Sequence, residues 1–529
     1  MRTCSQLHCL AENYVTEIGK FKFKINKFVF FNSFSMKIFF SIFFCFLFLN
    51  AFGQKDVDPT ILTIETPILS EGYEAQVFSF KNNSFAVFHF EGEGLNKLYL
   101  HIFHYSGDFK LLNEVKFATT GFKLSEVRGP FWDQNNRIYF FGQNDSGGKK
   151  YYYDAVEQKF DEENLEWDAN SSFELTYFSP YDKGWIACSQ VFNPLVSIGL
   201  KRSKKVEGIN IIDVVDNKVS IIPISVDGSE PKNTYCSALA YMKKSNVIVA
   251  QVSVKEDGKR NYSQHILIYD TNGNLLADHQ YELEEGVGQF STEIIEKSNM
   301  EFYMMGMSMT TRRDEFSMYK IHFTDKIIGE LELDDATAIF DRSCTAEITN
   351  KGNAYMDTED PALSKYSIHD PLYVKDGFYL IVEKAIPNIV LVVDPTTRTT
   401  SHKTKGYNYD FVYVLKYDLD ANLQWQNCLE MSFDYKPKYF IDLVCVATDP
   451  LPNVKLGYIG VSFVTSKAFD ASGEVVKSAS SVDLFNANYR GTYTEDYQEQ
   501  SRLIYLSGNT FLGCHYLRKS IELKKYEFE

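Results

Sequence analysis

The sequence predicts an all-β fold, an eight-bladed β-propeller, and three observations support this prediction. A hairpin pattern recurs at residues 269–276 and 469–476: an aromatic residue and Asp, a tight glycine turn, then two aliphatic residues. A strongly apolar strand precedes each copy at intervals of about 50 to 80 residues, the length of one four-stranded blade with its loops. The 43 Phe and 34 Tyr also favour strands over helices.

The apolar strand is predicted to be the second strand of each blade, and the recurring turn is predicted to join the third strand to the fourth. Looser copies of the turn lie at 105–112 and 417–425, and copies without glycine lie at 153–160 and 214–221. The predicted second strands are residues 84–90, 137–141, 185–188, 246–250, 301–305, 377–382, 457–463 and 510–514.

The two ends of the propeller are predicted to meet in one sheet. Residues 521–528 form the third strand of the last blade, and the sequence then ends. Residues 61–67 precede the first blade and have no blade of their own. Pairing these two segments would close the ring and cover an exposed strand edge. A seven-bladed ring, with one module degenerate or used as decoration, is the alternative count.

Residues 1–53 are predicted to be a leader, with the signal peptide proper at 36–53. Met36 and Lys37 give a positive start, an apolar run of about a dozen residues follows, and Ala51 and Gly53 suit cleavage before Gln54. This run is shorter than the roughly 20 residues of a membrane-spanning helix. Residues 54–529 are therefore expected to be a single exported propeller domain that does not span the membrane.

Charge and cysteine content narrow the class of protein. The chain has 54 Lys and Arg against 70 Asp and Glu, and without the leader the net charge is about −20. Such a surface repels nucleic acid and anionic lipid, so no nucleic-acid partner is expected. The remaining cysteines are predicted to be buried free thiols, because they lie in apolar, strand-like settings without a Cys-x-x-Cys pair. They are Cys188, Cys236, Cys344, Cys428, Cys445 and Cys514.

Long insertions are predicted near 193–208, 334–370, 385–409 and 477–500. All four fall between second and third strands or between blades, which places them on one face of a propeller. Long loops in a compact domain usually have a function, so this face is the predicted binding surface.

Two groups of residues on this face are candidates for partner binding. Lys201, Arg202, Lys204 and Lys205 form a basic cluster that would suit an acidic partner or a lipid headgroup, or would simply be solvated. Tyr407 and Tyr409 would suit stacking on sugars or on a protein, or packing in the core.

Residues with catalytic potential are few. Glu74, Asp133, Asp182 and Glu293 lie on or near first strands, where a pair across the axis would suit glycoside hydrolysis. An acidic chain also supplies such residues by chance. Neither a Gly-x-Ser-x-Gly elbow nor space for a hydrolase domain is found in the sequence, so a non-enzymatic role is expected.

No metal or cofactor is predicted. His101 and His104 are three apart in a strand and so face opposite sides, which disfavours joint ligation. The acidic segment 357–360 and the turn at 270–274 offer oxygen ligands for calcium. A solvated loop in the first case, and side-chain capping of the turn in the second, account for them equally well.

The hairpins at 269–276 and 417–425 resemble the repeats of quinoprotein-like and related bacterial envelope propellers, over nearly all of residues 60–529. The chain has only four Trp and lacks the adjacent Cys-Cys pair of quinone-dependent dehydrogenases. The resemblance therefore implies a non-catalytic relative that scaffolds an outer-membrane protein machine.

The phenylalanine-rich signal and the Tyr-Asp-x-Asn-Gly turn also look like those of exported Bacteroidota proteins. In that setting the resemblance implies a protein partner in the cell envelope and a periplasmic accessory or plug subunit, for example of the type IX secretion and gliding apparatus. The absence of an appended sorting domain favours the periplasm. A secreted or cell-surface location, and a carbohydrate-binding or glycoside-hydrolysing propeller, are the alternatives.

Overall fold

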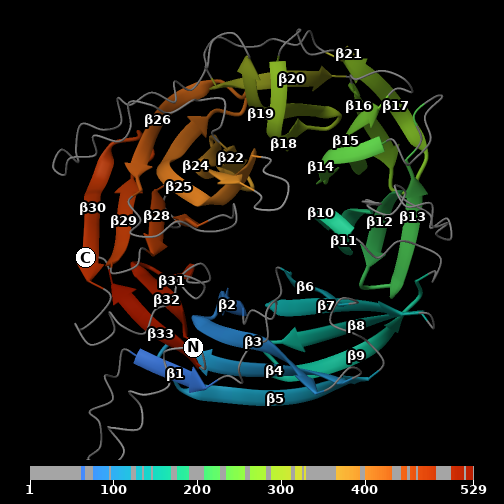
Figure 1. Cartoon of the computed structure of the whole chain (residues 1–529). Coiled ribbons are helices and arrows are strands. Elements are labelled where there is room, and N and C mark those ends of the chain that lie inside the picture. Colours follow the sequence, from blue (N-terminus) through green and yellow to red (C-terminus); the bar gives the residue numbers. More distant parts are fainter. Residues whose placement is uncertain are drawn as a thin grey trace, which may run out of the picture. The chain divides into compact units, whose positions relative to one another are not determined.

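The computed structural model places residues 60–529 in one compact unit (Figure 1). Within this unit every described element is a strand, and no described helix is long and apolar enough to cross a bilayer. The structure describes residues 61–65, 76–93, 97–120, 127–133, 136–144, 147–167, 175–189, 208–224, 226, 234–255, 262–281, 287–310, 316–324, 327–328, 365–393, 400–431, 443–448, 453–459, 463–483, 502–517 and 520–527.

The described strands form eight antiparallel sheets, each ordered from an inner first strand to an outer last strand. The first four sheets are continuous runs of four strands. They contain β2 (Gln76–Phe80), β3 (Ser84–Glu93), β4 (Lys97–Ser106) and β5 (Leu111–Thr120); β6 (Val127–Trp132), β7 (Arg137–Asn144), β8 (Gly147–Asp154) and β9 (Lys159–Leu165); β10 (Leu175–Tyr181), β11 (Gly184–Ser189), β12 (Gly208–Asp213) and β13 (Lys218–Pro223); and β14 (Thr234–Met242), β15 (Val247–Lys255), β16 (Tyr262–Asp270) and β17 (Leu275–Tyr281).

Three more sheets are continuous, and the last combines both ends of the unit. The continuous ones contain β18 (Val287–Ser298), β19 (Glu301–Thr310), β20 (Phe316–Thr324) and β21 (Ile327–Ile328); β22 (Lys365–Ile368), β23 (Leu372–Val374), β24 (Gly377–Val393), β25 (Thr400–Tyr417) and β26 (Leu423–Glu430); and β27 (Cys445–Thr448), β28 (Val454–Ile459), β29 (Phe463–Phe469) and β30 (Val475–Asp483). The last, here called the closing sheet, contains β31 (Arg502–Ser507), β32 (Thr510–Leu517), β33 (Ser520–Glu527) and β1 (Ile61–Glu65).

The fold is an all-β propeller, but the predicted count of eight blades is wrong. The arrangement is seven-bladed: seven blades are each continuous in sequence, and the closing sheet is formed by the two ends of the unit. The blades also differ in composition. The sheet of β22–β26 has five strands, because β23 pairs with β24 beside β22, and the outer strand β21 is only two residues long.

The predicted pairing of the two ends is present. Strand β1 runs antiparallel to β33, with Ile64 opposite Ile521 and Leu62 opposite Leu523. Residues 61–65 thus supply the outermost strand of the sheet that ends the chain.

The hydrophobic core lies between the sheets. Buried side chains form eight clusters, each joining two neighbouring sheets. In β3, for example, Phe85 and Val87 pack against the closing sheet, whereas Ala86 and Phe88 pack against the sheet of β6–β9. Because alternate residues point to opposite faces, every sheet is buried on both sides, which explains the near-continuous apolar second strands.

Two local predictions are wrong. Residues 457–463 do not form one strand, because β28 ends at Ile459 and β29 begins at Phe463. Most of residues 385–409 are strand, because the aliphatic run 389–393, in which four of five residues are β-branched, extends β24 and pairs with the start of β25. The other predicted insertions lie largely outside the described residues.

The prediction of free thiols is confirmed for the five cysteines that the structure describes. Four are buried and Cys445 is half-buried. Burial raises the pKa of the Cys445 thiol to about 12, so this group remains protonated at neutral pH. Cys344 lies outside the described residues.

Candidate functional sites

One end of the sheets carries short turns and is here called the turn rim. The opposite end, called the loop rim, carries the connections between second and third strands and between sheets. The turn rim comprises residues 81–83, 182–183, 243–246, 299–300, 375–376 and 508–509, which precede second strands, and 107–110, 155–158, 214–217, 271–274, 418–422 and 470–474, which join third to fourth strands.

The Asp of the recurring hairpin caps its own turn. Asp270 Oδ1 accepts the backbone N–H groups of Asn272 and Asn274 at 2.9 and 2.8 Å, and Oδ2 accepts the Asn274 side-chain amide at 2.8 Å. Asp418 and Asp470 accept the equivalent N–H groups in their turns. These bonds, the Asn274 side chain foremost, hold the pKa of Asp270 below its usual value. Turn capping therefore accounts for the oxygens that had also suggested calcium.

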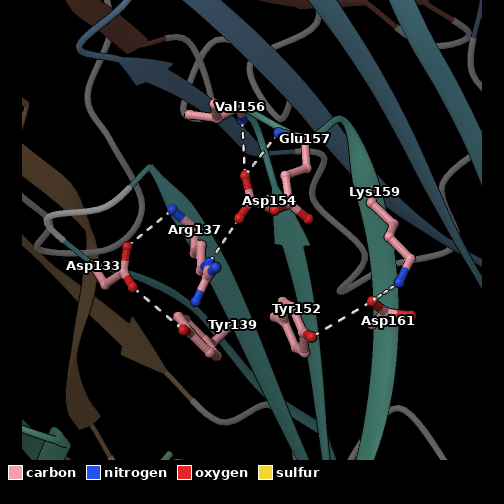
Figure 2. A network of polar contacts seen from close by, with 9 residues as sticks. All are labelled: Asp133, Arg137, Tyr139, Tyr152, Asp154, Val156, Glu157, Lys159 and Asp161. Carbon is pink, nitrogen blue, oxygen red and sulfur yellow. Dashed lines mark hydrogen bonds and ion pairs between the residues drawn. The ribbon is translucent and has the colours of Figure 1, made fainter. Parts of the chain in front are cut away.

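Asp133, one of the candidate carboxylates, directly follows the first strand β6 and contacts the second strand β7 of the same sheet. Its Oδ1 accepts the N–H of Arg137 at 2.9 Å, and its Oδ2 accepts the Tyr139 hydroxyl at 3.3 Å (Figure 2). The Arg137 side chain also donates to Asp154 at 2.7 Å. Although burial opposes it, hydrogen bonds from the N–H of Glu157 and from Arg137 hold the pKa of Asp154 below its usual value. This network fixes the turns of one sheet.

Asp182, a second candidate carboxylate, connects two sheets. It lies in the turn between β10 and β11, and Lys243 Nζ of the next sheet is 2.8 Å from its Oδ1. The Tyr241 hydroxyl donates to its Oδ2 at 3.2 Å. The hydrogen bond from Lys243 lowers the pKa of Asp182, which keeps it ionised. The fourth candidate, Glu74, lies outside the described residues.

Glu293 has a different environment. It lies on the inner strand β18 and shares a face with Ile295, which packs against the sheet of β22–β26. Burial raises the pKa of Glu293 to about 8, and the charge of Asp370, two residues after β22, raises it further. Glu293 is therefore largely protonated at neutral pH, beside a second carboxyl group. A perturbed carboxyl on an inner strand is a candidate functional group.

Glu383 was missed by the sequence reasoning. It is fully buried in β24. The N–H of Leu443 donates to both carboxylate oxygens, at 3.1 Å to Oε1 and 3.0 Å to Oε2, and the N–H of Val444 donates to Oε1 at 2.9 Å. His369 Nε2 lies 2.7 Å from Glu383 Oε1. These contacts hold the chain where it enters the next sheet. The signal that could have revealed it was one Glu in the otherwise apolar strand Phe-Tyr-Leu-Ile-Val-Glu.

The two histidines of β4 face opposite sides, as predicted. His104 is buried, with Nδ1 2.9 Å from the Tyr153 hydroxyl and Nε2 2.8 Å from Ser84 Oγ. His101 stacks on His89, with 4.5 Å between ring centroids. Burial lowers the pKa of His104 to about 4. Ser84 is only 3% exposed, so this Ser–His contact belongs to the packing and is closed to a substrate.

The structure places the two candidate tyrosines in the core. Tyr407 and Tyr409 belong to β25 and are only 9% and 3% exposed. They pack in one cluster with Ala385 and Leu443, because residues predicted to be a loop pair with β24. The basic residues Lys201, Arg202, Lys204 and Lys205 lie outside the described residues. Across the described ranges, no three His, Cys, Asp or Glu side chains are arranged to hold a metal ion.

Comparison with known proteins yields no family: no family model and no curated protein matches the sequence. The propeller domain of the Trilobed protease from Pyrococcus furiosus is similar at a TM-score of 0.33 and 9% identity, over 78% of this chain and 99% of that one. Puromycin hydrolase reaches 0.36 at 10% identity, over 73% and 50% of the two chains.

Two further solved structures are similar at comparable or lower TM-scores. Prolyl oligopeptidase B from Galerina marginata reaches a TM-score of 0.35 at 10% identity, over 90% of this chain and 59% of that one. Synechocystis apocarotenoid oxygenase reaches 0.28 at 10% identity, and the matched region spans 48% of this chain and 60% of the oxygenase. The propeller assignment rests on the strand pairing described above and not on these likenesses.

Proposed function

We propose that the chain is a non-catalytic, protein-binding propeller of the cell envelope, an accessory subunit of an outer-membrane complex on the periplasmic side. The observation that carries the proposal is the use of Asp133 and Asp182. Both are candidates for chemistry by position, but Asp133 is bound into a turn of its own sheet and Asp182 into a contact between two sheets. The hydrogen bonds and the ion pair of these two carboxylates therefore stabilise the scaffold.

Further contacts between sheets extend this rigidity around the turn rim. Glu296 accepts hydrogen bonds from the N–H groups of Lys244 and Ser245 at 2.8 Å each. Lys455 Nζ donates to the carbonyl oxygen of Gly508 at 2.9 Å. A platform that is already ordered loses little conformational entropy on binding, which favours docking of a protein partner.

The location in the envelope is supported by the sequence. The predicted leader, the net charge of about −20 after its removal, and the resemblance to envelope propellers agree with an exported protein. A plug or accessory role in type IX secretion or gliding is the specific form of this proposal.

The test is affinity purification of the tagged full-length chain from envelopes solubilised in mild detergent, followed by measurement of the size of the recovered complex. The expected result is a stoichiometric complex larger than the monomer that survives 0.15 M salt. Recovery of the monomer alone would overturn the proposal.

A second candidate function, binding or hydrolysis of carbohydrate, is favoured by one observation. Glu293 lies on an inner strand within the electrostatic influence of Asp370, which follows the inner strand β22, and the raised pKa of Glu293, about 8, suits a general acid at neutral pH. The test is hydrolysis and binding of a panel of polysaccharides by the native chain, Glu293→Gln and the control Asp182→Asn. Loss of activity in Glu293→Gln alone supports this function, and inactivity of the native chain rejects it.

A further inference from the structure

A serine, a histidine and an aspartate form a hydrogen-bonded line on the sheet of β14–β17. Ser263 and His265 are two residues apart near the start of β16, so their side chains project from the same face. His265 Nε2 lies 3.1 Å from Ser263 Oγ, and Nδ1 lies 2.9 Å from Asp278 Oδ1 on the outer strand β17. The order hydroxyl, imidazole, carboxylate is the arrangement that activates a serine as a nucleophile.

The partners of the imidazole decide which nitrogen carries its hydrogen. An ionised carboxylate can only accept, so Nδ1 donates its hydrogen to Asp278. In the neutral ring Nε2 is then an acceptor, and the Ser263 hydroxyl donates to it. The carbonyl oxygen of Val254 is a second acceptor for this hydroxyl, but at 3.4 Å it is the more distant one. Ser263 is therefore positioned to give its proton to His265.

The surroundings of the three side chains strengthen their hydrogen bonds. His265 lies opposite Val252 and Ser263 lies opposite Val254, two buried residues of β15. The side chains of His265 and Asp278 are only 9% and 29% exposed. Within the described ranges this carboxylate forms an ion pair with the histidine and with no lysine or arginine. Its hydrogen bond, largely removed from water, holds the imidazole in one orientation.

The contact between Ser84 and His104 provides a comparison within the same chain. There the second ring nitrogen faces the Tyr153 hydroxyl and not a carboxylate, and Ser84 is 3% exposed. Ser263 is half-buried and is the second residue of β16, at the loop rim. Ser263 is therefore both the better activated and the more accessible of the two serines.

We propose that Ser263 is a site of covalent acylation by a small activated ester, with His265 as the general base and Asp278 as the residue that orients it. Ser263 Oγ forms a bond to the acyl carbon, and the bond from that carbon to the leaving oxygen breaks. The hydroxyl proton passes to His265 Nε2 and from there to the leaving oxygen, which departs as an alcohol or a phenol. This step modifies the chain once and is not a turnover, so it goes beyond the proposed function and is compatible with it.

The first test measures acetylation of the purified full-length chain by p-nitrophenyl acetate at about pH 8, where an unperturbed imidazole is neutral. The release of nitrophenol gives the rate, and peptide mass spectrometry locates the acetyl group. We expect about one equivalent per chain on Ser263, formed at least about tenfold faster than on any other serine.

Ser263→Ala should remove this adduct, and Ser253→Ala is the matched control. Ser253 is half-buried near the same end of the sheet, and its hydroxyl donates to Gln264 Oε1 at 2.8 Å and not to a histidine. The control should therefore be acetylated as the native chain is. Absence of an adduct on Ser263 in the native chain would overturn the proposal.

The second test concerns the general base and the residue that orients it. His265→Gln and Asp278→Asn should each slow acetylation of Ser263 by at least about tenfold, whereas Asp278→Glu keeps the carboxylate and should retain part of the rate. Urea unfolding shows whether each variant folds as the native chain does. A purely structural contact would leave the rate at Ser263 the same in all folded variants, and that result would also overturn the proposal. Because the purified chain is tested alone, its failure leaves the protein-binding function standing.

Discussion

Trp425 of β26 packs against Gly473 in the turn of the neighbouring sheet, and its indole N–H donates to the carbonyl oxygen of Ala471 at 2.8 Å. A Cβ atom at residue 473 would lie 2.5 Å from Trp425 Cδ2, and the backbone there has φ of +85°. The glycine of the recurring hairpin therefore meets two demands, the left-handed turn and the close approach of the next sheet.

Gly473→Ala should therefore destabilise the chain more than Gly273→Ala. Gly273 has a similar φ of +90°, but a Cβ there would meet only the flexible Ile222 Cγ1 at 3.2 Å. We expect a loss of about 1 kcal/mol for Gly273→Ala from backbone strain, and about 2–4 kcal/mol for Gly473→Ala from strain and overlap together. Urea unfolding of both variants measures the difference, and equal losses would contradict the proposed overlap with Trp425.

Ile64 should make a large contribution to stability because its buried side chain holds β1, from the start of the unit, against β33 at its end. It is 5% exposed and packs with Leu512 and Leu523 in the closing sheet. Ile64→Ala should cost about 2–4 kcal/mol, the usual range for a buried isoleucine. Thr63→Ala, an exposed neighbour on the same strand, is the control and should change stability by less than about 0.5 kcal/mol. Similar effects of the two substitutions would argue against a structural role for β1.

The sequence predicts well the parts of this fold that repeat. The turn Asp residues and the apolar second strands follow from local patterns, because strand period and turn chemistry act over a few residues. The pairing of β1 with β33 follows from the count of strands, because the last sheet lacks an outer strand and residues 61–65 have no blade of their own. The number of blades was predicted wrongly, because the repeat pattern counts the composite closing sheet as one more blade. The pattern also did not reveal the extra strand β23 or the short outer strand β21.

The candidate site residues were harder to predict for a physical reason. Tyr407 and Tyr409 alternate as an exposed strand end would, and their burial depends on pairing with Ala385 and Pro387, residues on a strand that was expected to be a loop. Glu383 looks like an ordinary strand residue until the N–H groups of Leu443 and Val444 are placed beside it. In both cases the outcome depends on contacts between segments that lie far apart in the sequence, which no local pattern reveals.

Removal of the Glu383 carboxylate should be strongly destabilising. Glu383→Ala would leave the N–H groups of Leu443 and Val444 without their buried acceptor, which we expect to cost about 3–5 kcal/mol. Glu383→Gln keeps an acceptor oxygen and should lose roughly half as much. Glu157→Gln, on an exposed turn, is the control and should be near neutral. Hydrogen exchange at residues 443–448 should rise in Glu383→Ala before global unfolding. Unchanged protection there would contradict the assigned role.

The free energy of unfolding should fall with rising pH because of the raised pKa of Glu293. Its pKa is raised from 4.5 to about 8 in the folded chain, mainly by burial and further by the charge of Asp370. A carboxyl whose folded pKa is raised favours folding below pH 4.5, and this contribution is lost as the pH rises toward 8. The loss is on the order of 4 kcal/mol. Glu293→Gln should remove this pH-dependent loss, so the variant should be more stable than the native chain at pH 9 and similar at pH 4.5.

Urea unfolding at pH 4.5, 7 and 9 measures the difference in stability, with Glu157→Gln as the control. A native chain and a Glu293→Gln variant with parallel profiles would show that Glu293 is ionised in the fold.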